Sequence, residues 1–531
     1  MDFVHHSGDS PEKPFPSANG SGLAAFDFDL DRRPDLLFAT GNPFPVDPAT
    51  ARQANRCYRN RGGWRFDDVT APSGLGHRGY THGVAVGDVD ADGFPDLFLA
   101  CYGADVLYRN NGDGTFAVVT SGVEDPRWSS TGVFFDADAD GLLDLFVCRY
   151  GKWTPEDNPF CGDRVRGRRV FCSPMTVEPE ADSLWHSDGD GTFRDVATEV
   201  GLGGRPVRGL GVVATRLDDD EWIDLYVAND LNPNQLFLGG PDGRFRDASD
   251  LSGTAFDSLG RVKSSMGVDA ADTTGSGRCD LIVTDFEGEY DLFFANAGGG
   301  TFHDASERSG IGPPGLPLVG WGVQFADFDA DGREDVVIAN GHVGDERREV
   351  RGAESLRQPL LVLANRGPRF APVPAATLGT PFVDLHQGRA VVAADLDGDG
   401  DADLAFNHRD EPAALLRNDA ASAATATQAL VVRLVGTRGN RDAIGSSVTL
   451  RGSTGPTQHR PVKGGGGYLS SRDPRLAFAV SRTEPSAGLE IRWPHGGRSS
   501  VAGLAAGREY VVIEPTTADG DPTVVDLGEV R

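Results

Sequence analysis

Apolar and polar positions along this chain alternate in a unit that recurs over most of its length. In the clearest copy, an apolar stretch that ends in small residues, Gly83–Gly87, precedes an aspartate-rich loop, and a second apolar stretch, Leu97–Ala100, follows it. A third stretch, Leu107–Phe116, contains an Asn-Gly and an Asp-Gly pair and ends in a phenylalanine that begins a fourth stretch. Short apolar runs bounded by such turn residues are typical of β-hairpins. The pattern predicts four short strands in each unit.

The unit occurs seven times, starting near residues 27, 88, 136, 216, 272, 327 and 395. The turn that ends in phenylalanine also recurs, at Leu184–Phe193, Leu236–Phe245, Leu292–Phe302, Leu361–Phe370 and, less closely, Tyr58–Phe66. Seven units of four strands, each about 50–60 residues long, are typical of a β-propeller, whose blades bury their faces against one another. The sequence therefore predicts an all-β fold, with a seven-bladed β-propeller over residues 1–418 and a small C-terminal β domain.

The seventh unit lacks a strand of its own. It ends at Leu415–Asn418 without the phenylalanine-led strand that closes the other units. Three segments are candidates to complete its sheet: residues upstream of Met1, the first few residues of the chain, or the segment Thr523–Leu527.

The aspartate-rich loops have the spacing of cation ligands. Five copies place acids at positions 1, 3, 5 and 9, and a glycine at position 6 of four of them permits a sharp turn. The first copy has Arg32 at that position instead. The predicted ligands are Asp27, Asp29, Asp31, Asp35; Asp88, Asp90, Asp92, Asp96; Asp136, Asp138, Asp140, Asp144; Asp327, Asp329, Asp331, Asp335; and Asp395, Asp397, Asp399, Asp403.

Ca²⁺ is the predicted cofactor of these loops, because Mg²⁺ demands stricter octahedral geometry and releases water reluctantly. The simpler alternative is that the loops are acidic turns that bind no ion. Two further copies depart from the pattern: one has Arg216 at the first position, and the other keeps Asp272 and Asp280 but no acids between them. We expect hydrogen bonds to hold these two loops, with at most weak calcium binding at Asp272.

Charge and composition exclude several classes of partner. The net charge of −29 leaves no basic stripe for nucleic acid and argues against adhesion to anionic membranes. No apolar run approaches the roughly 18 residues of a membrane span, and Met1–His6 shows no export signal. Cys161 and Cys172 lie close enough in sequence to close a loop as a disulfide, whereas the other four cysteines fall at strand positions and are expected to be buried thiols.

Two parts of the chain resemble known families. The acid loop with its following strand resembles the FG-GAP/VCBS repeats of integrin-like propellers, over about residues 20–418. Residues 430–515 resemble an ASPIC/UnbV domain through the phrases Gly439–Gly445, Gly464–Ser470 and Ile491–Gly496. We place a linker at 419–429 and a tail at 516–531, and interpret Gly464–Gly467 as a flexible turn. Proteins with this combination are similar to the secreted acidic cartilage protein family, which implies a secreted or periplasmic location.

The propeller face opposite the acid loops is the predicted ligand face. It collects residues that precede the first strand or follow the second strand of each unit, together with the insertions Gly151–Glu180 and Gly344–Arg357. Function concentrates in loops held by a rigid scaffold. The candidate ligand-binding residues are His82, Asn229, Asp230, Lys263, Glu289, Trp321, His342 and His386.

These features predict a calcium-stabilised extracytoplasmic binding or adhesion protein that recognises a glycan or a protein through this face. The alternative is a polysaccharide lyase or hydrolase with its active site in the central mouth of the same face, where His342 and Asp230 can form an acid/base pair. No catalytic sequence motif supports the enzyme, and its analogy rests on the fold alone.

Overall fold

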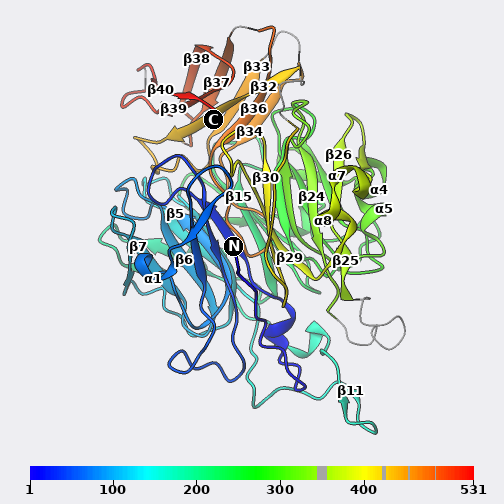
Figure 1. The fold of residues 1–531 in the computed structure, drawn as a ribbon. Helices are drawn as coiled ribbons and strands as arrows, with labels where there is room; N and C mark the ends of the chain where they lie inside the picture. Colours follow the sequence, from blue (N-terminus) through cyan, green and yellow to red (C-terminus); the bar gives the residue numbers. More distant parts are fainter. Residues whose placement is uncertain are drawn as a thin grey trace.

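The computed structural model describes residues 1–343, 356–420, 426–451, 455–484, 486–494, 496–518 and 520–530. It contains a ring of β-sheets and, above the ring in Figure 1, a smaller β domain. Most of the predicted insertion Gly344–Arg357 and part of the predicted linker, residues 421–425, lie outside the described residues. No helix among the described residues is long and apolar enough to cross a bilayer.

Seven antiparallel sheets form the propeller. The first three are β1 (Leu23–Phe26), β2 (Asp35–Phe38), β3 (Arg56–Asn60), β4 (Phe66–Asp68); β5 (Tyr80–Gly87), β6 (Asp96–Tyr102), β7 (Val106–Asn110), β8 (Phe116–Val119); and β9 (Ser129–Phe135), β10 (Asp144–Arg149), β13 (Ser183–Ser187), β14 (Phe193–Asp195). The next two are β15 (Gly209–Thr215), β16 (Asp224–Asn229), β17 (Gln235–Leu238), β18 (Arg246–Asp247); and β19 (Val268–Ala271), β20 (Asp280–Val283), β21 (Leu292–Gly298), β22 (Thr301–Asp304). The last two are β23 (Gly320–Ala326), β24 (Asp335–Asn340), β26 (Leu361–Asn365), β27 (Phe370–Pro372); and β29 (Gly388–Ala394), β30 (Asp403–His408), β31 (Ala414–Leu416).

Short elements connect these sheets. Two small strand pairs are β11 (Gly162–Asp163) with β12 (Arg168–Arg169), and β25 (Gln358–Pro359) with β28 (Leu385–His386). The helices within the described residues are single turns: η1 (Phe15–Ala18), α1 (Thr70–Ser73), η2 (Pro174–Thr176), α2 (Ala197–Val200), α3 (Ser249–Ser252), α4 (Ser306–Ser309), α5 (Gly312–Gly315), α7 (Ala375–Leu378) and α8 (Thr380–Val383).

The first strands of the seven sheets surround a central channel. Each contacts the first strand of the next sheet, and β29 contacts β1, so the ring is closed. The first few residues of the chain complete the seventh sheet, because the Ala413 N–H donates to the Phe3 carbonyl and the His5 N–H donates to the Glu411 carbonyl. Of the three predicted candidates, the N-terminal residues therefore fill this role.

Asparagine side chains link neighbouring blades near the third strands. The Asn110 amide donates to the Phe28 carbonyl of the preceding blade at 2.9 Å, and Asn365 donates to Thr273 in the same way at 3.0 Å. Asn60 of the first blade donates to the Leu396 carbonyl of the seventh blade at 2.7 Å. The same contact that repeats along the ring therefore also closes it.

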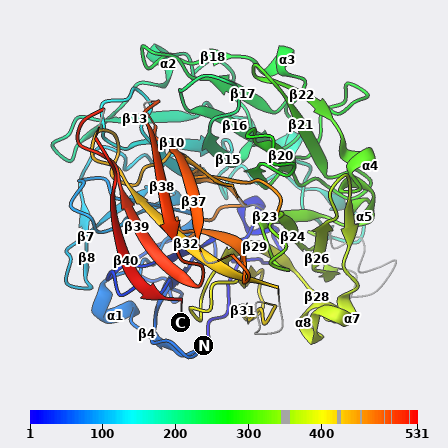
Figure 2. The ribbon, with the colours of Figure 1, turned by 90° about the horizontal axis from the view of Figure 1, so that it is seen from above.

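The C-terminal domain consists of two four-stranded sheets. They contain β32 (Thr427–Val435), β36 (Leu476–Ser481), β39 (Arg508–Ile513), β40 (Thr523–Glu529); and β33 (Ser447–Arg451), β34 (Gln458–Pro461), β37 (Ala487–Arg492), β38 (Arg498–Leu504). The predicted boundaries need correction, since Thr427 already begins β32 and the predicted tail supplies β40, which pairs with β39. Figure 2 shows this domain across the centre of the ring. Its core joins that of the propeller in one hydrophobic cluster, which includes Phe134 of the propeller and Trp493 of the C-terminal domain.

One loop of the C-terminal domain, residues 463–473, enters the central channel; we call it the channel loop. Its strand β35 (Gly464–Gly465) pairs with Val213 and Ala214 of β15. Farther along, Gly467 pairs with Val268, and the Ser471 carbonyl accepts from the Ala25 N–H. The prediction of a flexible turn at Gly464–Gly467 is therefore wrong. The glycines are needed because the loop runs directly against the inner strands: a Cβ at Gly464 would collide with the Phe134 carbonyl oxygen.

This close approach makes a testable prediction. Gly464→Ala should lower the free energy of unfolding by about 1–3 kcal/mol, the usual cost of overpacking. Gly204→Ala is a matched control, because a Cβ there meets no atom within 4 Å. Chemical denaturation of both variants measures the difference, and equal stability of the two would contradict a tightly packed channel loop.

Candidate functional site

The acid loops join the first and second strand of each blade and lie on the face beneath the C-terminal domain, which we call the acid-loop face (Figure 1). The carboxylate at position 1 closes the loop on itself. Asp88 accepts the N–H groups of Asp92 and Gly93 at 3.0 and 2.8 Å, and Asp327 accepts those of Asp331 and Gly332. Asp272 accepts the two equivalent hydrogen bonds, from Ser276 and Gly277. This loop, which departs from the acidic pattern, therefore holds its shape by hydrogen bonds, as expected.

The carboxylate at position 9 ties three strands together. Asp96 accepts the Val89 N–H in the loop at 2.9 Å and the Asn110 N–H at the end of the third strand at 2.7 Å. In every blade this acid accepts a backbone N–H on or just after the third strand, through Asp35, Asp96, Asp144, Asp224, Asp280, Asp335 and Asp403. The position therefore has a structural role that persists in the two departed loops, and spacing alone did not reveal it.

The acids also form clusters that suit a hard cation. Carboxylate oxygens lie within 4.8 Å of one another in the groups Asp27, Asp29, Asp35; Asp88, Asp90, Asp96; Asp136, Asp138, Asp140; and Asp327, Asp329, Asp335. Burial raises the pKa of Asp88 to about 7 and that of Asp96 to about 8. Burial likewise raises the pKa of Asp335 to about 8 and that of Asp395 to about 7. Buried carboxylates ionise with difficulty when no positive charge is near, and a bound cation would favour their ionised form. A set of donors made only of carboxylates fits a divalent cation that prefers oxygen ligands.

The third loop has an additional donor. His186 Nδ1 lies 3.1 Å from a carboxylate oxygen of Asp144 and 3.6 Å from one of Asp138. An imidazole nitrogen suits transition metals better than calcium. His186 is not among the ligands predicted from the sequence, because it lies on the third strand of its blade and outside the spacing of the acid loop.

The C-terminal domain covers the acid-loop face through polar contacts with the loops. Asp442 accepts the Asp88 N–H at 2.9 Å, and Arg460 pairs with Glu334 at 3.0 Å. Arg32, which replaces the position-6 glycine of the first loop, pairs with Glu509 at 2.6 Å. The departures from the loop pattern thus contribute to the contact between the two domains.

Several predicted ligand residues are buried and support neighbouring segments. His82 Nδ1 lies 3.0 Å from the Gly20 carbonyl oxygen, and Asn229 donates to the Pro233 carbonyl at 2.8 Å. Trp321 donates to the Gly341 carbonyl at 2.7 Å and packs edge-on against Tyr468 of the channel loop. These three side chains are less than 4% exposed and hold the fold rather than present a recognition surface.

Three other predicted residues come together beside the fifth blade. Asp230 accepts the Tyr150 hydroxyl at 2.7 Å and pairs through its backbone with Ser264, next to the buried Lys263. Glu289 accepts the Ser264 N–H at 3.0 Å and remains half-buried. Burial raises the pKa of Asp230 to about 6.

The two remaining histidines lie elsewhere on this side. His342 Nε2 is 3.4 Å from Glu287, and its ring packs against Phe286. His386 stacks on His408, with ring centroids 4.4 Å apart, and its Nδ1 is 3.5 Å from Glu411. The structure thus groups Asp230, Lys263 and Glu289 and gives each histidine a local acidic neighbour.

The central mouth is filled with side chains. Phe15 from the N-terminal segment and Tyr468 and Leu469 from the channel loop belong to one buried cluster with Trp128 and Tyr150. The Tyr468 hydroxyl donates to the Asn19 carbonyl at 3.1 Å, so the two segments meet inside the ring. The central mouth, where the sequence placed an alternative active site, is occupied by the protein itself.

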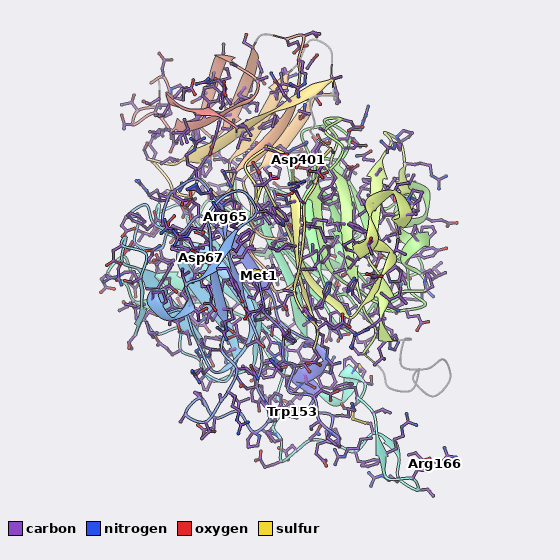
Figure 3. All side chains as sticks on the ribbon, in the orientation of Figure 1. Met1, Arg65, Asp67, Trp153, Arg166 and Asp401 are labelled. Atoms are coloured by element: carbon purple, nitrogen blue, oxygen red, sulfur yellow. A yellow bond between two sulfur atoms is a disulfide. The ribbon has the colours of Figure 1, made fainter. Side chains whose placement is uncertain are left out.

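The insertion Gly151–Glu180 projects from the opposite face and ends in a hairpin whose tip carries Arg166 (Figure 3). A disulfide joins Cys161 to Cys172, and β11 pairs with β12 between them. We call residues 161–172 the basic hairpin, because they include the arginines 164, 166, 168 and 169. The side chain of Arg166 is 76% exposed and Val165 is 97% exposed.

Sequence comparison agrees with both parts of this architecture. The FG-GAP-like repeat family matches residues 27–99, 88–147, 216–283 and 272–338, and the ASPIC and UnbV family matches residues 436–519. The chain is therefore a β-propeller protein of FG-GAP-like repeats that carries an ASPIC and UnbV domain. It is homologous to Cartilage acidic protein 1, with 27% identity to the Homo sapiens protein over 67% of this chain and 51% of that protein.

The Xenopus tropicalis form is 26% identical over 64% of this chain and 49% of that protein. The chain thus spans about half the length of the curated relatives it matches. Among solved structures, it is similar in fold to the BP39L lectin from Burkholderia pseudomallei, with 12% identity, a TM-score of 0.43, and coverage of 75% of this chain and 95% of that chain. An Agrocybe aegerita lectin gives 16% identity, a TM-score of 0.41, and coverage of 75% and 94%. These structural similarities are distant and say nothing about the ligand of this chain.

The raised pKa values give a pH-dependent prediction. Asp88, Asp96 and Asp335 have folded-state pKa values of about 7 to 8. In an unfolded chain they titrate near pH 4, so their ionisation penalty grows, and stability falls, as pH rises from about 4 to about 8. In EDTA, the melting temperature should therefore be lower at pH 8 than at pH 5. Calcium should reduce that difference, and an identical pH dependence with and without calcium would contradict cation binding at these acids.

Proposed function

We propose that this protein is a calcium-stabilised extracytoplasmic binding protein that recognises a glycan or protein through the face opposite the acid loops. The main support for this proposal is that one face of the propeller is covered by the C-terminal domain and the opposite face is exposed. The C-terminal domain covers the acid-loop face and the channel loop fills the centre, whereas the basic hairpin stands exposed on the opposite face.

The charge of the basic hairpin favours an acidic ligand. The hairpin carries four arginines in a stretch of six residues, whereas the chain as a whole has a net charge of −29. The disulfide fixes the hairpin ends, and the rings of Phe160 and Phe171 take cation–π contacts from Arg164 and Arg409. A preorganised cationic loop loses little conformational entropy when it meets an anionic surface. Among the predicted ligand residues, Glu289 and His386 are the ones not fully buried and complete the proposed rim of this face.

Calcium is the proposed cofactor of the acid loops. It would be held by the loop carboxylates, for example the cluster of Asp88, Asp90 and Asp96 together with Asp92 at the predicted fifth position of that loop, and would neutralise their mutual repulsion. A secreted or periplasmic location is part of the proposal. It is supported by the disulfide, since such bonds persist in oxidising compartments, and by the homology to Cartilage acidic protein 1.

Two loop variants test the calcium assignment with a matched control. Asp92 and Asp220 both stand at position 5, and each accepts one backbone N–H at 2.8 Å, from Phe94 and Trp222 respectively. Asp92→Asn should remove the calcium bound at its loop, as measured by titration calorimetry. Asp220→Asn should leave the calcium stoichiometry unchanged, because Arg216 already occupies the first ligand position there. Equal loss of calcium in both variants would count against the assignment.

Charge reversal on the basic hairpin tests the ligand face. Calcium-loaded protein is first screened against a glycan array and against immobilised acidic proteins, and the strongest ligand is kept. The double variant Arg164→Glu/Arg166→Glu should weaken that ligand about tenfold or more, because two favourable charges become repulsive. Arg244→Glu is the control, since its side chain is 66% exposed on another blade. Unchanged affinity in the double variant would refute recognition by the hairpin.

A further inference from the structure

A polar cleft of about 480 Å³ separates the fourth and fifth blades from the C-terminal domain. The propeller contributes Arg216 and Arg278 from two departed acid loops, and β37 and β38 contribute Arg492 and Arg498. The two loops that lost the acidic pattern therefore face the same cleft. This site lies on a different face from the basic hairpin and involves none of its residues.

The arginines of this cleft are not all neutralised. Arg278 pairs with Asp219 at 2.8 Å, and Arg451 pairs with Glu490 at 3.1 Å. Among the described residues, no carboxylate lies within ion-pair distance of Arg216, Arg492 or Arg498. Asp218 is the other acid of the lining, and its carboxylate accepts the Asp220 N–H.

Neutral oxygens hold two of these guanidinium groups in place. Arg216 donates to the Trp493 carbonyl at 3.4 Å and to the Ser447 hydroxyl at 3.3 Å, both in the C-terminal domain. Arg492 donates to the Asp220 carbonyl in the propeller. Each is thus oriented across the domain contact by a group that carries no charge. Burial, with a smaller contribution from the neighbouring charge of Arg492, lowers the pKa of Arg216 to about 10.

The remaining lining adds groups that suit an oxyanion on a polar molecule. Thr449, Ser499 and Ser500 supply hydroxyls, and His459 Nδ1 lies 2.9 Å from the Thr449 hydroxyl. Guanidinium forks match the oxygens of sulfate and phosphate in pairs. The volume exceeds that of a single ion and falls in the range of small-molecule sites.

We propose that this cleft binds a sulfate or phosphate group carried by a sugar, with Arg216, Arg492 and Arg498 as its cationic ligands. Arg216 stands at position 1, where the five acid loops have an aspartate. Because arginine is positively charged, this loop can hold a negatively charged ligand instead of a cation. The site differs in this respect from the five acid loops on the same face.

Titration calorimetry on the full chain in calcium tests the proposal at constant ionic strength. The probes are glucose 6-sulfate, glucose 6-phosphate, inorganic sulfate and glucose. We expect saturable binding of the two sugar esters, weaker binding of inorganic sulfate and none of glucose. Equal affinity for inorganic sulfate and glucose 6-sulfate would overturn the sugar-borne ligand, and no saturable binding of any anion would overturn the site.

Two variants locate the binding. Arg216→Gln and Arg498→Gln should each weaken the sugar esters about tenfold or more, since each removes a charged donor. Arg498 is exposed, so its variant leaves the domain contact intact even where Arg216→Gln disturbs it. Arg244→Gln is the control and should bind as the wild type does. Wild-type affinity in Arg498→Gln would overturn the assignment.

Discussion

The open edge of each inner strand is the constraint on which the rest of this structure depends. Seven sheets face one channel, and each first strand presents backbone N–H and C=O groups on the side that has no neighbouring strand of its own blade. Buried groups of this kind must find partners. The channel loop supplies several: the Gly466 N–H donates to the Val212 carbonyl, the Val268 N–H donates to the Gly467 carbonyl, and the Val84 N–H donates to the Leu469 carbonyl. A backbone that satisfies other backbones at such short range must be rich in glycine.

Much of the fold could be predicted because it is encoded locally and repeated. The acid loops, the turn before the phenylalanine and the four strands recur in the same order from unit to unit, so each copy supports the others. The channel loop could not be predicted in this way. Its glycines have no period, and its partners, such as Leu23 and Val268, lie hundreds of residues away in the sequence. The position of the C-terminal domain over the acid-loop face could not be predicted either, because it depends on the same long-range contacts.

The candidate site was predicted less completely, for a physical reason. Residues at strand ends were assigned to ligand recognition, but His82 and Asn229 instead hydrogen-bond the N-terminal segment and a loop, and Trp321 packs against Tyr468 of the channel loop. A polar side chain near a channel has two possible roles, and only the contacts made by distant segments distinguish them. The reverse holds for Arg216, which reads as a lost metal ligand in the sequence and lines a cationic cleft in the structure.

The contact between the first residues and the seventh blade has a consequence for how the molecule is made. Phe3 and His5 cannot pair until Glu411 and Ala413 have been synthesised. The inner edge of the first blade waits still longer, for Ser471. Contacts of such sequence separation form slowly and leave strand edges exposed in the interim. The C-terminal domain thus completes the inner edge of the first blade, and this edge stays unpaired until the channel loop has been synthesised.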